Sequence, residues 1–163
     1  GIVAGIETAA GVEHAPATLA AAGIVGAYFG AEDFVVDMGG VRTESNVEVL
    51  YARSRLVLAG RLAGVPVIDQ VVADFGDEAR FRREAAEARA MGFAGKLCIH
   101  PSQVALAREA FIPGEAEIDR ARAMLAAYDA AVAEGRASIG FEGQMVDEPV
   151  ARQARQLLAR AES

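Results

Sequence analysis

The sequence predicts an α/β fold with a parallel sheet, and three observations support this prediction. Four short apolar runs lie at residues 2–6, 24–29, 65–68 and 96–99. Apolar runs of this length are typical of parallel strands that are buried on both faces. Longer segments with helical character separate the runs, and the resulting β-α-β-α order favours right-handed crossover connections.

Three helical segments are expected between and after these strands. Residues 11–22 are rich in alanine, and residues 47–62 carry apolar side chains such as Leu56 at helical spacing. Residues 77–91 are strongly amphipathic, and the acidic residues in their first turn suit the helix dipole. We expect these helices to cover the sheet.

The pattern changes after His100. Ser102 is expected to cap a short helix that ends near residue 110, and Pro113 and Gly114 interrupt the chain there. A longer helix is expected at residues 115–134, followed by a glycine-punctuated loop. A last helix starts in the stretch Asp147-Glu148-Pro149 and ends near residue 161. We therefore expect a body over residues 1–110 and a helical extension over residues 111–163, packed on the body or reaching another subunit.

Length and composition indicate a globular domain rather than a disordered or nucleic-acid-binding chain. The chain has 163 residues, of which 53% are hydrophobic and 24% charged, and this suits one domain with a substantial core. The net charge is −7, and the chain shows no basic patch of the kind that nucleic-acid binders carry.

The sequence predicts a cytoplasmic protein without a membrane span. The single cysteine, Cys98, excludes an internal disulfide and fits a reducing compartment. No apolar run approaches the roughly 20 residues that a spanning helix needs, and no signal peptide is recognisable.

Ionisable residues follow all four expected strands. Glu7 follows the first, Glu32 and Asp33 the second, Asp69 the third and His100 the fourth. In α/β barrels and in open parallel sheets, the carboxyl ends of the strands form the ligand-binding edge. Taken singly, each has an ordinary structural explanation: a solvated strand end, a turn or cap residue, a bond to a loop backbone, or a structural histidine. On spacing alone, Asp147 is an ordinary helix N-cap.

Taken together, the carboxylates at adjacent strand ends are the ligands that Mg²⁺ favours. This ion takes one or two carboxylates and completes its shell with waters and substrate oxygens. The small residues Gly30 and Ala31 would let backbone N–H groups approach an anionic substrate. Zinc-type cysteine and histidine spacing, the GxxxxGK[ST] loop, a GxGxxG turn after a strand and the GxSxG elbow are all missing from the sequence.

Six motifs occur in an order that resembles a known family. They are GIETAAGV, FGAEDFVVDMGG, YARSR, VIDQVVADFGD, GFAGKLCIHPSQ and FEGQMVDEP. As a set they resemble the citrate lyase beta-subunit-like branch of the HpcH/HpaI aldolase family, over nearly the whole chain. From the residues alone, four strands fit either an open sheet or half of an eight-stranded barrel. The resemblance implies strands 5–8 of a TIM barrel at residues 1–110, followed by the C-terminal extension at residues 111–163.

The resemblance also implies an activity. Members of this family cleave or form a carbon–carbon bond in β-hydroxyacyl thioesters such as citryl, malyl or citramalyl thioesters, with Mg²⁺ as cofactor. The products are a small keto acid and an acyl thioester. Because relatives are nearly twice as long, the resemblance implies that the natural protein is longer than this chain and that a half-barrel would be inactive alone.

Site residues are implied by the same motifs. Glu7 and Asp33 correspond to the metal ligands, and Asp147 to a proton-transfer residue that reaches a neighbouring subunit's site. This arrangement implies a homo-oligomer, a trimer or a multiple of it. The backbone N–H groups of Gly30, Ala31 and Glu32 are implied to bind the substrate carboxylate.

Five further residues receive weaker expectations. We expect Arg53 and Arg55 to be helix-face or subunit-contact residues and Cys98 to be a core residue. Lys96 and His100 are weaker candidates near the barrel mouth.

Several alternatives stay open at this stage. A thioester hydrolase on the same scaffold fits the same metal site, and a non-catalytic binding or assembly half-barrel is a third reading. An aldolase acting on free hydroxy-keto acids is less favoured, because shorter relatives with that activity lack the extension near GQMVD. The sequence does not distinguish coenzyme A from an acyl-carrier protein as the thioester carrier.

Overall fold

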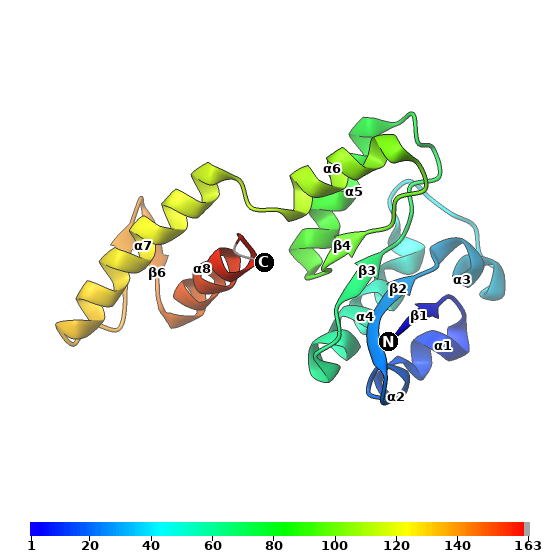
Figure 1. Ribbon diagram of the computed structural model, residues 1–163, viewed down its shortest axis with the longest axis horizontal. Helices are drawn as coiled ribbons and strands as arrows, with labels where there is room; N and C mark the ends of the chain where they lie inside the picture. Colours follow the sequence, from blue (N-terminus) through cyan, green and yellow to red (C-terminus); the bar gives the residue numbers. More distant parts are fainter. Residues whose placement is uncertain (162–163) are drawn as a thin grey trace. The chain divides into compact units, whose positions relative to one another are not determined.

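The computed structural model describes residues 1–161, and the chain divides into two compact units after Phe111 (Figure 1). The first unit contains a parallel sheet with helices, and the second contains two helices and a small hairpin. This division falls within one residue of the expected boundary. The assignment of the two parts to half a barrel and its extension stays a prediction.

The first unit is built on a four-stranded sheet in the order β1-β2-β3-β4. All three neighbouring pairs are parallel, so the predicted α/β class with a parallel sheet is confirmed. The first two strands begin and end at the expected residues, whereas the third starts two residues later than expected and the fourth is shorter. The strands are β1 (Ile2–Ile6), β2 (Ile24–Phe29), β3 (Val67–Asp69) and β4 (Gly95–Lys96).

The helices of this unit differ from the expectation at two places. The alanine-rich segment forms two five-residue helices that meet at His14, because Pro16 lies in the first turn of the second and cannot continue the first. A seven-residue helix directly after β2 was not expected. The elements are α1 (Ala9–Glu13), α2 (Ala15–Leu19), α3 (Ala31–Asp37), η1 (Val47–Val49), α4 (Leu50–Ala63), α5 (Glu78–Met91) and α6 (Pro101–Phe111).

The core of the first unit lies between the sheet and its helices. Phe29 and Ala27 on β2 and Leu56 on α4 are completely buried there. Helix α4 packs closely against the next strand, since a Cβ atom on Gly60 would overlap Cγ2 of Val67 on β3 and lie 2.7 Å from the carbonyl oxygen of Val65 just before it. The close packing fixes α4 behind the sheet.

The first strand is exposed, contrary to the expectation that all strands are buried on both faces. Ile2 and Val3 are each 59% exposed, and Val25 on β2 is 56% exposed. The physical reason is that β1 lies at the edge of the sheet and pairs only with β2.

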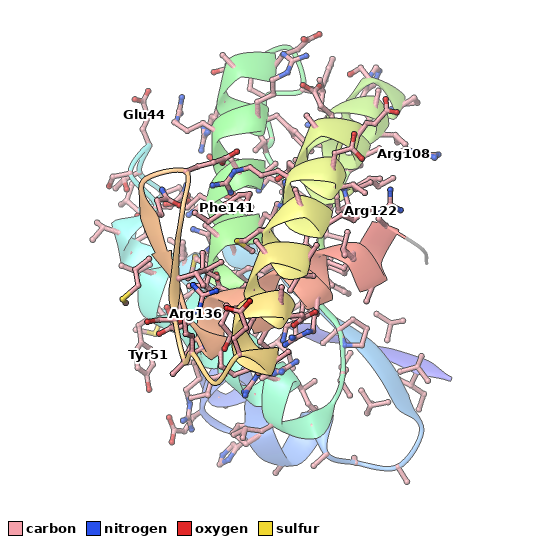
Figure 2. The ribbon with its side chains drawn as sticks, turned by 90° about the vertical axis from the view of Figure 1, so that its left-hand side faces the viewer. Glu44, Tyr51, Arg108, Arg122, Arg136 and Phe141 are labelled. Carbon is pink, nitrogen blue, oxygen red and sulfur yellow. The ribbon has the colours of Figure 1, made fainter. Side chains whose placement is uncertain are left out.

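The second unit, described here as residues 112–161, is a helix–hairpin–helix arrangement. The expected loop contains a hairpin whose turn residues Glu142 and Gly143 both have positive φ angles, of 49° and 78°. Figure 2 shows this hairpin as the orange ribbon that carries Phe141. The elements are α7 (Glu115–Ala133), β5 (Ile139–Phe141), β6 (Gln144–Val146) and α8 (Glu148–Ala161).

Within residues 1–161, no helix combines the length and the apolar character that crossing a membrane would require.

Candidate functional site

The carboxyl ends of β1 and β2 bring Glu7 next to Gly30. Ile6 is opposite Phe29 in the register, and the Gly30 N–H donates to the Ile6 carbonyl at 3.0 Å. A Cβ atom on Gly30 would lie 2.7 Å from both Cβ and Oε2 of Glu7. The Glu7 side chain therefore lies directly over Gly30, and a larger residue at that position would displace it.

Helix α3 turns the face that carries Asp33 toward the Glu7 turn. Asp33 and Asp37 are four residues apart on this helix, so their side chains lie on the same face. Asp37 Oδ2 accepts the Ala9 N–H at 2.7 Å, and Ala9 lies only two residues after Glu7. The structure therefore puts Glu7, directly after β1, and Asp33, in the first turn of the helix that follows β2, at the same edge of the sheet.

Neither the Glu7 carboxylate nor the Asp33 carboxylate has a hydrogen-bond or ion-pair partner among the described residues 1–161. The same residues contain no cluster of three or more histidine, cysteine or acidic side chains suited to hold a metal. Two carboxylates without a protein cation fit Mg²⁺, which completes its shell with waters and substrate oxygens. They do not fit a closed structural zinc site, which needs four protein ligands.

The start of α3 modifies the expectation for the backbone donors. The amide of Gly30 already has a partner in the Ile6 carbonyl, so it does not serve as a free donor. Ala31 and Glu32 occupy the first turn of α3, where amides have no partner within the helix. The structure thus leaves the amides of these two residues as the candidate donors, and gives Gly30 a steric role beside Glu7.

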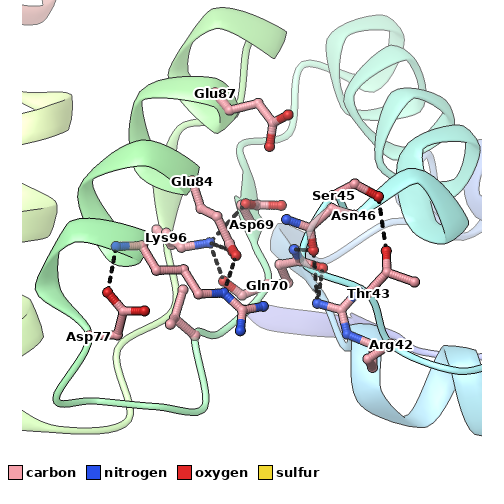
Figure 3. Close-up of polar contacts among 12 residues, drawn as sticks. Arg42, Thr43, Ser45, Asn46, Asp69, Gln70, Asp77, Glu84, Glu87 and Lys96 are labelled. Carbon is pink, nitrogen blue, oxygen red and sulfur yellow. Dashed lines mark hydrogen bonds and ion pairs between the residues drawn. The ribbon is translucent and has the colours of Figure 1, made fainter.

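Arg42, which the sequence analysis did not single out, is fixed close to this edge. Its Nε donates to Glu32 Oε1 at 3.0 Å, and its Nη2 donates to Asn46 Oδ1 at 3.1 Å and to Gln70 Oε1 at 3.3 Å. Asn46 and Gln70 are buried. Figure 3 shows Arg42 beside these two amide side chains. In the sequence, Arg42 could have been noticed only as a single arginine in a loop that contains glycines and acidic residues.

Asp69, at the end of β3, is held in a buried ion pair rather than open to a ligand. Arg53 donates to both of its carboxylate oxygens, and Lys96 Nζ lies 3.1 Å from Oδ2. All three side chains have 0% exposure. The expectation for Arg53, as a helix-face or subunit-contact residue, was therefore wrong. Lys96 lies at the end of β4, and its ammonium group is engaged by Asp69.

The charges of this buried cluster shift pKa values. Burial lowers the pKa of the Arg53 guanidinium, but the charges and hydrogen bonds of Asp69 and Glu87 outweigh it and hold the pKa above its ordinary value. Burial raises the pKa of the Glu84 carboxyl, but the Arg80 hydrogen bond and the Lys96 charge hold that pKa below its ordinary value. Both groups are therefore charged at neutral pH, and the cluster stabilises the fold.

His100 lies at the same edge but is exposed. Its ring stacks on Phe75 with centroids 4.6 Å apart, and Nδ1 is 2.8 Å from Ser102 Oγ. Helix α6 begins at Pro101 rather than after a Ser102 cap. Cys98 is exposed, so its expected core position was wrong.

Asp147 belongs to the second unit, where it caps α8. Its Oδ1 accepts the Val150 N–H at 3.3 Å, and its carbonyl accepts the Ala151 N–H at 2.9 Å. The hydrogen bond from the Val150 N–H confirms the interpretation of Asp147 as a helix cap. The role of Asp147 in proton transfer stays a prediction.

Comparison with known proteins identifies relatives over the whole chain. Residues 1–101 match the family model described as HpcH/HpaI aldolase/citrate lyase. A citrate lyase subunit beta-like protein of Deinococcus radiodurans is 52% identical over 158 residues, which are 97% of this chain and 56% of that protein. Citrate lyase subunit beta of Escherichia coli K12 is 37% identical over 163 residues, covering 99% of this chain and 54% of the relative. The chain thus spans about half the length of the curated relatives it matches.

Among solved structures, the chain resembles protein CitE from Mycobacterium tuberculosis in complex with magnesium, acetoacetate and coenzyme A. The TM-score is 0.85 at 36% sequence identity, and the match covers 99% of this chain and 61% of that one.

Proposed function

The chain belongs to the HpcH/HpaI aldolase/citrate lyase family, and from this membership we propose that its protein is a Mg²⁺-dependent carbon–carbon lyase. The substrate class is a β-hydroxyacyl thioester such as citryl-, malyl- or citramalyl-CoA, and the products are a keto acid and an acyl thioester. The observation that carries the proposal is the pair of unpartnered carboxylates, Glu7 and Asp33, at adjoining strand ends. The solved CitE complex with magnesium and coenzyme A supports both the metal and the carrier.

The architecture we propose for the whole protein is a TIM barrel, of which this chain supplies strands 5–8. Two observations support it. The edge strand β1 exposes Ile2 and Val3, each by 59%, as a strand would that lacks a neighbour on one side. The match to CitE covers 61% of that longer chain.

Glu7 and Asp33 are the residues that would hold the metal. A bound Mg²⁺ would act as a Lewis acid toward the oxygen of the keto-acid half of the substrate. The missing side chain of Gly30 leaves the space that the Glu7 side chain occupies. The amides of Ala31 and Glu32 would donate hydrogen bonds to the substrate carboxylate and orient it for bond cleavage.

Asp147 is the proposed proton-transfer residue. As the hydroxyl O–H bond breaks and the new C=O bond forms, the electron pair of the carbon–carbon bond passes to the α-carbon of the acyl thioester. Asp147 would shuttle the hydroxyl proton to that carbon. We propose that Asp147 comes from a neighbouring subunit, which requires a homo-oligomer, a trimer or a multiple of it. Its contact with the Val150 N–H fixes the side chain at the start of α8.

The test uses the full-length protein with Mg²⁺ and malyl, citramalyl and citryl thioesters of coenzyme A, with products identified by mass spectrometry. Glu7→Gln removes one candidate ligand, and Asp119→Asn removes an exposed carboxylate of α7 as a matched control. A keto acid plus a shortened thioester, lost in Glu7→Gln and kept in Asp119→Asn, supports the lyase. Free coenzyme A with an intact hydroxy acid would identify a hydrolase, and no turnover at all would leave a binding module.

A further inference from the structure

We propose that Asp37 is a positioning residue for the metal site, acting by holding the Glu7 turn against helix α3. The inference rests on the proposed function, because it concerns the geometry of the two carboxylates proposed to bind Mg²⁺. Asp37 is the last residue of α3 and is exposed, so the core gives no reason for its identity.

The contact joins two segments that are distant in sequence. Asp37 Oδ2 accepts the N–H of Ala9 at 2.7 Å, across 28 residues of chain. A hydrogen bond to an ionised carboxylate is about twice as strong as one between neutral groups. Ala9 begins α1, so the carboxylate also lies at the positive end of that short helix.

Each end of this contact is close to a proposed ligand. Ala9 follows Glu7 by two residues, and Asp37 follows Asp33 by one turn on the same face of α3. The hydrogen bond from Ala9 to Asp37 therefore links the segment that carries Glu7 to the helix that carries Asp33. Breaking it frees the Glu7 turn to move relative to Asp33.

Other contacts at this edge do not replace it. The bond from the Gly30 N–H to the Ile6 carbonyl joins the strand ends before the turn begins. Thr8 Oγ1 accepts the Gly11 N–H at 3.0 Å, which caps α1 from within its own segment. Asp37, at the end of α3, is bonded instead to Ala9, which lies two residues beyond Glu7.

The expected effect follows from the behaviour of residues that support metal ligands. Loss of such a support typically lowers metal affinity by about 10–100-fold. Asp37→Ala removes both the charge and the hydrogen-bond acceptor. Asp37→Asn removes the charge but keeps an acceptor oxygen for the Ala9 N–H, so we expect it to lose less affinity than Asp37→Ala.

The experiment measures Mg²⁺ affinity of the full-length protein by titration calorimetry. Wild type is compared with Asp37→Ala, Asp37→Asn and the charge-matched control Asp119→Ala on α7. We expect Asp37→Ala to weaken binding by about 10–100-fold, with a smaller loss in Asp37→Asn and with Asp119→Ala close to wild type. Hydrogen exchange of the peptide containing Ala9, measured without metal, should accelerate in Asp37→Ala alone.

Three results would overturn the inference. Equal losses in Asp37→Asn and Asp37→Ala would mean that the charge itself acts, as it would if Asp37 were a direct ligand. Unchanged affinity in Asp37→Ala, with or without a lower melting temperature, would leave Asp37 a purely structural residue and the proposed lyase intact. Absence of Mg²⁺ binding in wild type would overturn the metal site and this inference together.

Discussion

Arg53 and Asp69 form a bidentate ion pair that solvent does not reach. The two nitrogen–oxygen distances are 2.9 and 3.0 Å, and both side chains have 0% exposure. Lys96 Nζ donates to the same carboxylate at 3.1 Å and to the carbonyl of Gln70 at 2.9 Å. Because Asp69 ends β3 and Lys96 ends β4, the pair ties two strand ends to helix α4. The pair therefore has a structural role: it holds the carboxyl ends of β3 and β4 against helix α4.

Removal of the Arg53 guanidinium should strongly destabilise the protein. Arg53→Met leaves the buried Asp69 carboxylate with fewer donors, and breaking a buried pair costs about 3–5 kcal/mol. Urea unfolding followed by circular dichroism measures the change. Arg61→Met, on the exposed face of the same helix, should change the free energy of unfolding by less than about 0.5 kcal/mol. Similar values for the two variants would contradict the role of the buried pair.

The stability that Glu84 contributes should depend on pH. Burial raises the pKa of this carboxyl, but Arg80, Lys96 and Asn46 hold it below the model-compound value of 4.5. A carboxyl with a lowered pKa in the folded state stabilises above its unfolded value, and that stability is lost as the pH falls through the folded value. We therefore expect wild type to have a larger free energy of unfolding than Glu84→Gln. The difference should be complete above about pH 4.5 and should shrink below it.

The measurement is the free energy of unfolding of both proteins from about pH 7 to about pH 3. Glu134→Gln serves as the control, because Glu134 forms an ion pair while more than half exposed and such pairs contribute little. An advantage over Glu84→Gln that stayed constant through the acidic range would show that Glu84 acts through packing rather than charge.

The strands at the site were predictable because their signal is local. The runs at β1 and β2 are continuous and apolar and end in Glu7 and Gly30, so their bounds follow from the sequence alone. The rule that ligands bind at the carboxyl ends of parallel strands gave a wider set of ionisable residues, and the family resemblance narrowed that set to Glu7 and Asp33. Helix α3 was not predictable in this way, because seven residues are too few to show a helical period.

The buried ion pairs could not be predicted because they depend on tertiary contacts. An arginine in a helix is ordinarily exposed, and Arg53 is buried only because Asp69, sixteen residues later, meets it at the end of β3. The same holds for Arg42, whose partner Gln70 is 28 residues away. The hairpin in the second unit was missed because its strands are only three residues long.

A methyl group on Gly30 should disturb the proposed metal site. Its φ of −92° is open to any residue, so the effect of Gly30→Ala comes from contact alone. The new Cβ would lie 2.7 Å from Glu7 Oε2 and would displace the carboxylate. We expect Mg²⁺ affinity to fall by about tenfold or more, as measured by calorimetry on the full-length protein.

Gly114→Ala is the matched control for this substitution. Gly114 also precedes a helix, its φ is −75°, and no heavy atom lies within 4 Å of its ideal Cβ position. Its Mg²⁺ affinity should equal that of wild type. If Gly30→Ala also bound Mg²⁺ like wild type, the Glu7 carboxylate would not be a ligand in the position seen here.

Two substitutions should separate the observed helix-cap role of Asp147 from its proposed role in proton transfer. Asparagine caps helices about as well as aspartate, so Asp147→Asn should keep the contact with Val150 and leave the melting temperature near wild type. It cannot carry the proton, so turnover should fall by about 10²–10⁴-fold. Asp147→Ala should lose the cap as well, at about 1 kcal/mol, with turnover as low as in Asp147→Asn. Steady-state kinetics and thermal unfolding of both variants distinguish the two roles. If Asp147 only caps α8, the activity of each variant should fall in proportion to its loss of stability, and Asp147→Asn should remain active.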